Sequence, residues 1–155
     1  MDTMLSFTTS VPAMADIYVY SADRQLVVAI EFLGTYSTPE YLERMRSLVL
    51  EECAGAKPLY ILLVRPSHLH LWRGEAEPGT KPQSASTLPI IQALTPDLAA
   101  KGWVVSGYSL RMIITTWLDK FTLGFADVDS EADQLIVQSG IYDRMRNGNV
   151  EVVES

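Results

Sequence analysis

The sequence predicts a mixed α/β domain in which helices flank a central β-sheet. Two apolar, β-branched segments lie on either side of an amphipathic helix, which indicates a parallel strand pair joined by a helical crossover. A short polar connection further upstream indicates an antiparallel hairpin, so the sheet should be mixed. The chain of 155 residues has the size of one domain. We therefore expect a single domain over residues 1–155, with a core at about 15–72 and a helical C-terminal part at about 106–147.

The predicted hairpin comes first along the chain. Asp16 to Tyr20 is aromatic and β-branched, as strands commonly are, and the polar stretch Ser21 to Gln25 has the composition of a turn. Leu26 to Phe32 is a nearly continuous apolar run, which predicts a strand buried on both faces near the centre of the sheet.

A helix follows, with Thr38 as its predicted N-cap, Pro39 at its first helical position and Gly55 as its terminator. Apolar side chains at helical spacing predict its buried face: Tyr41, Leu42, Met45, Leu48, Val49 and Cys53. Charged side chains predict a solvated face: Glu43, Arg44, Arg46, Glu51 and Glu52.

Two more strands are predicted after this helix. Leu59 to Val64 is apolar throughout and should be a second buried strand, whereas His68 to Trp72 alternates between polar and apolar residues and should lie near an edge. Arg73 to Thr87 is rich in Gly, Pro, Ser and charged residues, which predicts a loop.

The C-terminal part is predicted to be mainly helical. Leu88 to Val105 gives no clear pattern, although Thr95-Pro96-Asp97 has the features of a helix start. A helix from about Ser109 to Phe121 follows from six apolar residues at helical spacing: Leu110, Ile113, Ile114, Trp117, Leu118 and Phe121. A further helix should begin after Ser130 and end or kink at Gly140, before a turn and the strand Val150 to Val153.

Composition narrows the classes of function. The chain has 12 Lys and Arg against 19 Asp and Glu, and its net charge of −7 disfavours non-specific binding to nucleic acid. Cys53 is its single cysteine, which excludes an intramolecular disulfide and a multi-cysteine zinc site. Met1 to Met14 lacks the basic flank of a secretion signal, and no run has the ~20 apolar residues of a membrane span. A cytoplasmic protein without a membrane partner is expected.

Two acidic residues are the main candidates for chemistry. Glu31 lies inside the apolar run of the second strand, where an ionised carboxylate is costly unless it is paired or bound to a metal. If the first two strands pair, Asp16 at the start of one lies beside Glu31 at the end of the other. Two carboxylates placed in this way could bind Mg²⁺. The alternatives are a surface aspartate and a glutamate that reaches solvent or a structural ion pair.

These residues resemble the core of the PD-(D/E)XK, or restriction-endonuclease-like, superfamily. The resemblance rests on Asp16, on Ile30-Glu31-Phe32-Leu33, on the helix Thr38 to Ala54 and on the strand Leu59 to Val64. It implies a restriction-endonuclease-like mixed central sheet flanked by helices, with Asp16 and Glu31 as ligands of Mg²⁺ or Mn²⁺. More weakly, the additional C-terminal helices resemble the tails of small cyanobacterial-type members.

The sequence also departs from the superfamily pattern. Active members usually have Lys two positions after the Glu, where this chain has Leu33, and Ala15 stands where the superfamily has Pro. The resemblance to Uma2-like proteins implies that a basic residue from the helix could replace this Lys, and Arg44 and Arg46 are the candidates. An arginine could stabilise charge but could not act as a general base. The alternative is that both arginines belong to a solvated helix face.

Three hypotheses follow. In the first, the chain is a catalytically degenerate nuclease-like domain without a cofactor, kept as a binding or assembly module for itself as a homodimer or for another protein. In the second, it is an active Mg²⁺- or Mn²⁺-dependent DNA endonuclease that uses Asp16 and Glu31 with Arg44 or Arg46. In the third, it is a small α/β protein unrelated to nucleases. The first is preferred, because of Leu33 and the acidic charge.

Other reactive side chains have less specific interpretations. His68 and His70 share one strand face and could bind a metal with a third ligand, but an exposed strand face is the preferred interpretation. Cys53 lies on the apolar helix face and is expected to be an inert core thiol.

Overall fold

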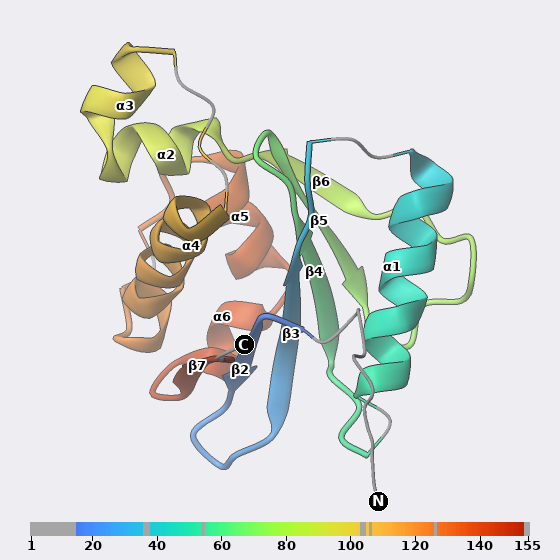
Figure 1. Cartoon of the computed structure of the whole chain (residues 1–155). Helices are drawn as coiled ribbons and strands as arrows, with labels where there is room; N and C mark the ends of the chain where they lie inside the picture. The colour runs from blue at the N-terminus through green and yellow to red at the C-terminus, as the bar shows by residue number, and fades with distance from the viewer. Residues whose placement is uncertain are drawn as a thin grey trace, which may run out of the picture.

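The computed structural model describes residues 15–35, 38–53, 55–102, 105, 107–125 and 127–153. Residues 1–14, on which the expectation about a secretion signal depends, lie outside the described residues. The described chain forms a mixed six-stranded open sheet with helices on both faces, which confirms the predicted fold class (Figure 1).

The sheet has the strand order β6-β5-β4-β3-β2-β7. Its strands are β2 (Ile17–Tyr20), β3 (Leu26–Phe32), β4 (Tyr60–Val64), β5 (His68–Arg73), β6 (Gln83–Ser86) and β7 (Asn149–Val152). Neighbours are antiparallel except for β3 and β4, which are parallel. The predicted parallel pair is therefore confirmed, as is the predicted hairpin between the first two strands.

The helices divide unequally between the two faces of the sheet (Figure 1). They are α1 (Pro39–Glu52), α2 (Leu88–Leu94), α3 (Pro96–Ala100), α4 (Gly107–Thr122), α5 (Glu131–Gln138) and α6 (Ile141–Met145). Helix α1 covers one face, where it packs on Ala29, Ile61 and Leu63. The later helices cover the opposite face and enclose the larger apolar core. Within the described residues, no helix is both long enough and apolar enough to cross a membrane.

Local sequence signals account for the helix ends. The Thr38 side chain accepts a hydrogen bond from the Tyr41 amide at 3.1 Å, and Pro39 occupies the first helical position, as predicted for α1. Ser130 caps α5 by accepting from the Asp133 amide at 3.1 Å. Gly140 then adopts a φ of 96°, a left-handed conformation that separates α5 from α6.

The amphipathic pattern of α4 is confirmed in full. The six apolar residues that predicted this helix are all buried in the larger core. The helix begins near the predicted residue, at Gly107, and ends at Thr122. Because its apolar stripe faces the sheet, its remaining side chains are half-buried or exposed.

The prediction of a loop over Arg73 to Thr87 is wrong in its last part, where β6 pairs with β5. The β6 sequence Gln-Ser-Ala-Ser is polar and has one buried side chain, Ala85, so it carries almost no hydrophobic signal. The predicted start of a short helix at Pro96 is confirmed by α3.

The last strand closes the opposite edge of the sheet. β7 pairs with β2 in the register Ile17↔Val152 to Tyr20↔Asn149. Before it, Gly148 passes so close to β2 that an added Cβ would lie 2.0 Å from the Tyr20 carbonyl oxygen. Only glycine fits there, since the contact is with main chain that cannot rotate away.

Candidate acidic site

The hairpin of β2 and β3 brings the two predicted acids together. Ile17 pairs with Ile30, so Asp16 lies beside the end of β3 that carries Glu31. The Asp16 amide donates to the Ile30 carbonyl at 2.7 Å, and the Phe32 amide donates to Asp16 Oδ2 at 2.8 Å. The expected proximity of Asp16 and Glu31 is therefore what the structure shows.

Glu31 is buried on the face of the sheet that α1 covers. The alternation of side chains along β3 places it between Ala29 and Leu33, which both belong to the core on that side. It is only 7% exposed, and its Oε1 has no hydrogen-bond partner among the described residues. Such an atom loses its hydration without compensation, so the neutral acid is favoured there.

The surroundings of Glu31 raise its pKa to about 9. Burial is the largest cause, followed by the negative charge of Asp16 and a hydrogen bond with Asp16, while the positive charge of Arg111 acts in the opposite direction. At neutral pH the Glu31 carboxyl is therefore protonated in the folded chain.

Arg111 completes the site and was not predicted from the sequence. It belongs to α4 on the opposite layer, and its Nη2 lies 2.7 Å from Asp16 Oδ1. Its guanidinium also lies 5.6 Å from the centre of the Phe32 ring. The site thus contains one carboxylate, one neutral carboxyl and one guanidinium, and these formal charges cancel.

Neither arginine predicted on α1 reaches this site. Arg44 is exposed to solvent. Arg46 is 1% exposed, so the predicted solvated position is wrong for this residue. Its Nη2 lies 2.6 Å from Glu43 Oε2, its Nη1 donates to the Ala76 carbonyl, and its guanidinium lies 5.9 Å from the Trp72 ring. Arg46 is therefore a buried structural residue of the α1 layer.

Leu33 lies in apolar surroundings, which suit its side chain. Its amide donates to the Val64 carbonyl at 2.8 Å, and its side chain is buried in the core beneath α1. No charged group stands at this position beside Glu31, as the sequence already indicated.

The donor set does not fit a divalent cation. Among the described residues, no group of three His, Cys, Asp or Glu side chains comes together. Asp16 already accepts a hydrogen bond from the Phe32 amide and forms an ion pair with Arg111, and Glu31 holds a proton. Mg²⁺ is usually held by one or two ionised carboxylates together with water, and the Arg111 guanidinium beside Asp16 would repel it.

Of the other candidate side chains, His68 is exposed as expected, whereas His70 and Cys53 are buried. The expected exposed face is wrong for His70, because β6 pairs alongside it: Arg65 Nε donates to His70 Nε2 at 3.1 Å, and His70 Nδ1 lies 2.7 Å from Ser84 Oγ. Burial is the main cause that lowers the pKa of His70 to about 4. Cys53 is buried as predicted, and burial raises the pKa of its thiol.

Comparisons with protein-family models, with curated proteins and with solved structures found no match for this chain. The fold and the site together define a mixed α/β domain with a charge-compensated pair of acids at the end of a hairpin.

Proposed function

We propose that this chain is a catalytically inactive nuclease-like domain that acts as a binding or assembly module. The observation that carries the proposal is the charge balance of the acidic pair. Arg111 lies 2.7 Å from Asp16, and Glu31 is a neutral acid at neutral pH. A metal-dependent nuclease needs the opposite arrangement, with anionic ligands for the metal and a nearby cation for the transition state.

Leu33 supports the same proposal. Hydrolysis of a phosphodiester requires a group that orients the attacking water and stabilises the charge that develops on phosphorus. A buried leucine does neither, and Arg46, which was one candidate to replace it, is bonded to Glu43 instead. In this proposal the chain keeps the two acids of the superfamily arrangement but does not catalyse the hydrolysis.

The alternative is an active Mg²⁺- or Mn²⁺-dependent DNA endonuclease in which the basic residue is relocated. The contact of Arg111 with Asp16 favours this arginine as the relocated cation, in place of Arg44 or Arg46. Arg111 would then have to release Asp16 when the metal binds. This alternative predicts metal binding, which the inactive domain lacks.

A nuclease assay separates the two functions. The wild-type chain and Glu31→Gln are incubated at micromolar concentration with supercoiled plasmid or single-stranded RNA and millimolar Mn²⁺ or Mg²⁺. We expect equal, background-level cleavage and no stabilisation by metal in thermal unfolding. Cleavage by the wild type that is abolished in Glu31→Gln would contradict the proposal, and metal binding lost in Asp16→Asn would establish the alternative.

The binding role concerns protein partners, with a second copy of this chain as the first candidate. The net charge of −7 disfavours nucleic acid. Tyr108 and Met112 are 76% and 50% exposed and lie one turn apart on α4, where large apolar side chains are costly in water. Sedimentation of the wild type and of the double variant Tyr108→Ser, Met112→Ser tests this: a dimer that the variant loses is expected, and a monomer at all concentrations would contradict self-association.

A further inference from the structure

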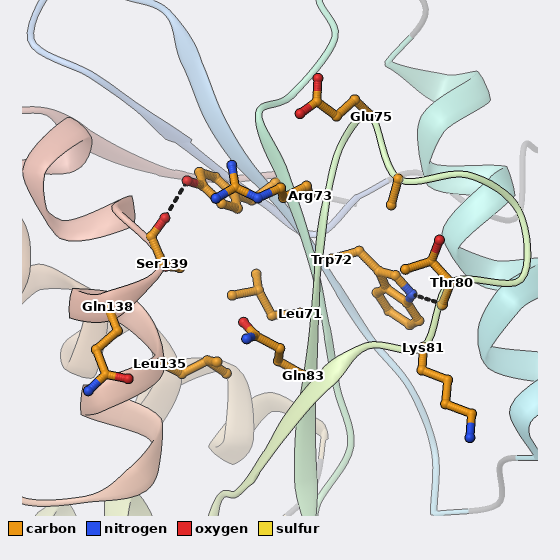
Figure 2. Close-up of a pocket in the computed structure, with 12 residues that line it drawn as sticks. Leu71, Trp72, Arg73, Glu75, Thr80, Lys81, Gln83, Leu135, Gln138 and Ser139 are labelled. Atoms are coloured by element: carbon orange, nitrogen blue, oxygen red, sulfur yellow. Dashed lines mark hydrogen bonds between the residues drawn. The ribbon is translucent and has the colours of Figure 1, made fainter.

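A pocket lies where two strands of the sheet separate. Pairing of β5 with β6 ends at Leu71↔Gln83, while β5 continues to Arg73. The pocket fills the resulting gap, has a volume of about 580 Å³ and is closed on its other side by the end of α5 (Figure 2). This volume suits a small organic molecule.

The walls of the pocket are preformed. The Tyr60 hydroxyl donates to the Ser139 carbonyl at 2.6 Å, which ties β4 to the end of α5. On the far side, the Trp72 indole donates to the Thr80 carbonyl at 2.8 Å and holds the loop that leads into β6. Since both walls are fixed by partly buried hydrogen bonds, a ligand would not have to order them.

The lining combines apolar side chains with polar side chains that are exposed to solvent. Leu71 projects from β5 toward Leu135 of α5, which gives the pocket an apolar centre (Figure 2). Gln83 and Gln138 also line it, and neither side-chain amide makes a hydrogen bond within the described part of the chain. Each amide therefore offers both a donor and an acceptor to a ligand.

The charge of the pocket differs from that of the molecule. Arg73 and Lys81 line it against one acid, Glu75, although the whole chain has a net charge of −7. Neither cation forms a salt bridge with a described residue. The Arg73 guanidinium lies 5.8 Å from the centre of the Tyr60 ring, at the rim of the pocket.

From these features we propose that the pocket binds a small aromatic anion. The planar guanidinium of Arg73 can pair with a carboxylate or stack on a flat ring. The apolar centre takes the body of the ring, and the two glutamine amides bind polar groups at its margin. This site lies apart from Asp16 and Glu31, and it does not depend on the inactive-nuclease proposal.

The test uses naphthoate as the probe and naphthamide as its neutral counterpart, with the binding followed in amide NMR spectra of the wild-type chain. We expect naphthoate to shift the signals of the Trp72 indole and of the Gln83 and Gln138 side chains. Naphthamide should bind about tenfold more weakly, since it lacks the charge. Equal binding of the two compounds, or no shift at millimolar naphthoate, would overturn the proposal.

Two variants assign the binding to this pocket. Arg73→Gln should weaken naphthoate binding about tenfold, because it removes the positive charge that pairs with the carboxylate. Since Arg73 is exposed, the substitution should not disturb the core. Arg44→Gln is the matched control, an exposed arginine that does not line the pocket, and it should bind as the wild type does. Thermal unfolding verifies that both variants fold. Equal affinities of Arg73→Gln and the wild type would also overturn the proposal.

Discussion

At the scale of single residues, Glu31 is the group that departs most from its ordinary chemistry. Its pKa rises from 4.5 to about 9 on folding, so the folded chain retains a proton that the unfolded chain loses. Stability therefore falls as the pH rises between these two values, by up to about 1.4 kcal/mol per pH unit, and this loss is absent at pH values below 4.5.

Glu31→Gln tests this directly. Glutamine imitates the neutral acid but cannot ionise in either state, so the variant should be more stable than the wild type at neutral pH. The difference in the free energy of unfolding should grow with pH up to about 9 and vanish under acidic conditions. Urea unfolding at a series of pH values measures it. A constant difference across that series would show that Glu31 does not titrate as described.

Arg111 forms an ion pair with Asp16 and opposes the rise of the Glu31 pKa. Arg111→Met retains much of the side-chain volume but removes the charge that opposes the rise of the Glu31 pKa. We expect that pKa to increase further, and stability to fall by about 1 kcal/mol, because the ion pair with Asp16 is partly exposed. Carboxyl NMR titration and urea unfolding measure the two effects.

The control for this variant is Arg24→Met, which removes the exposed pair of Arg24 with Glu151 at 3.5 Å. It should change neither the Glu31 pKa nor the stability appreciably. An unchanged or lower Glu31 pKa in Arg111→Met would mean that the guanidinium does not oppose the rise of that pKa.

The sequence predicts the pairing of Asp16 and Glu31, but it does not predict that Arg111 joins them. Glu31 stands out as a charged residue in an apolar strand, and the hairpin pairing then places Asp16 beside it. Arg111 gives no comparable signal, because it is one polar residue on an amphipathic helix. Its contact with Asp16 depends on how α4 packs across the sheet, which helical periodicity does not determine.

At the scale of elements, α1 is held to the sheet by a buried arginine. Arg46→Ala removes the ion pair with Glu43 and the bond to the Ala76 carbonyl, and it leaves a cavity beside Trp72. We expect a loss of about 3 kcal/mol in the free energy of unfolding. Arg44→Ala on the exposed face of the same helix should cost less than about 0.5 kcal/mol. Similar losses in both variants would contradict the structural role of Arg46.

Strongly periodic elements are the ones that the sequence predicts well. The six apolar residues of α4 are all buried, and the caps Thr38 and Ser130 mark the starts of α1 and α5. β6 has no such pattern, because its pairing depends on main-chain hydrogen bonds that any sequence can make. Overlooking β6 also explains the wrong expectation for His70, which β6 flanks.

At the scale of the whole molecule, acid stability should depend on His70. Its pKa falls from 6.5 to about 4 on folding, so the unfolded chain binds the additional proton between these values. This contribution to stability is complete above pH 6.5 and is lost as the pH falls toward 4. His70→Gln should therefore lose less stability on acidification than the wild type does.

The matched control is His68→Gln, since His68 is the exposed histidine of the same strand. Urea unfolding of the three proteins over this pH range gives the comparison. If His70→Gln and the wild type lost stability in parallel on acidification, the neutral, buried state of His70 would be refuted.

The sequence predicts which strands lie at the centre of the sheet better than it predicts which strands form its edges. The hairpin and the helical crossover establish β2, β3 and β4 as neighbours. The final strand is recognisable as a strand, but nothing local indicates that it pairs with β2. Such pairing joins distant segments and is decided by which edge the folded layers leave open.

That long-range pairing has a consequence for synthesis on the ribosome. β2 and β3 leave the exit tunnel early, whereas Arg111 and β7 emerge much later. During this interval a nascent hairpin exposes Asp16 without its guanidinium partner and one edge of β2 without its neighbour. The newly made chain should therefore carry an unpaired acid and an open strand edge, until Arg111 and then β7 cover them.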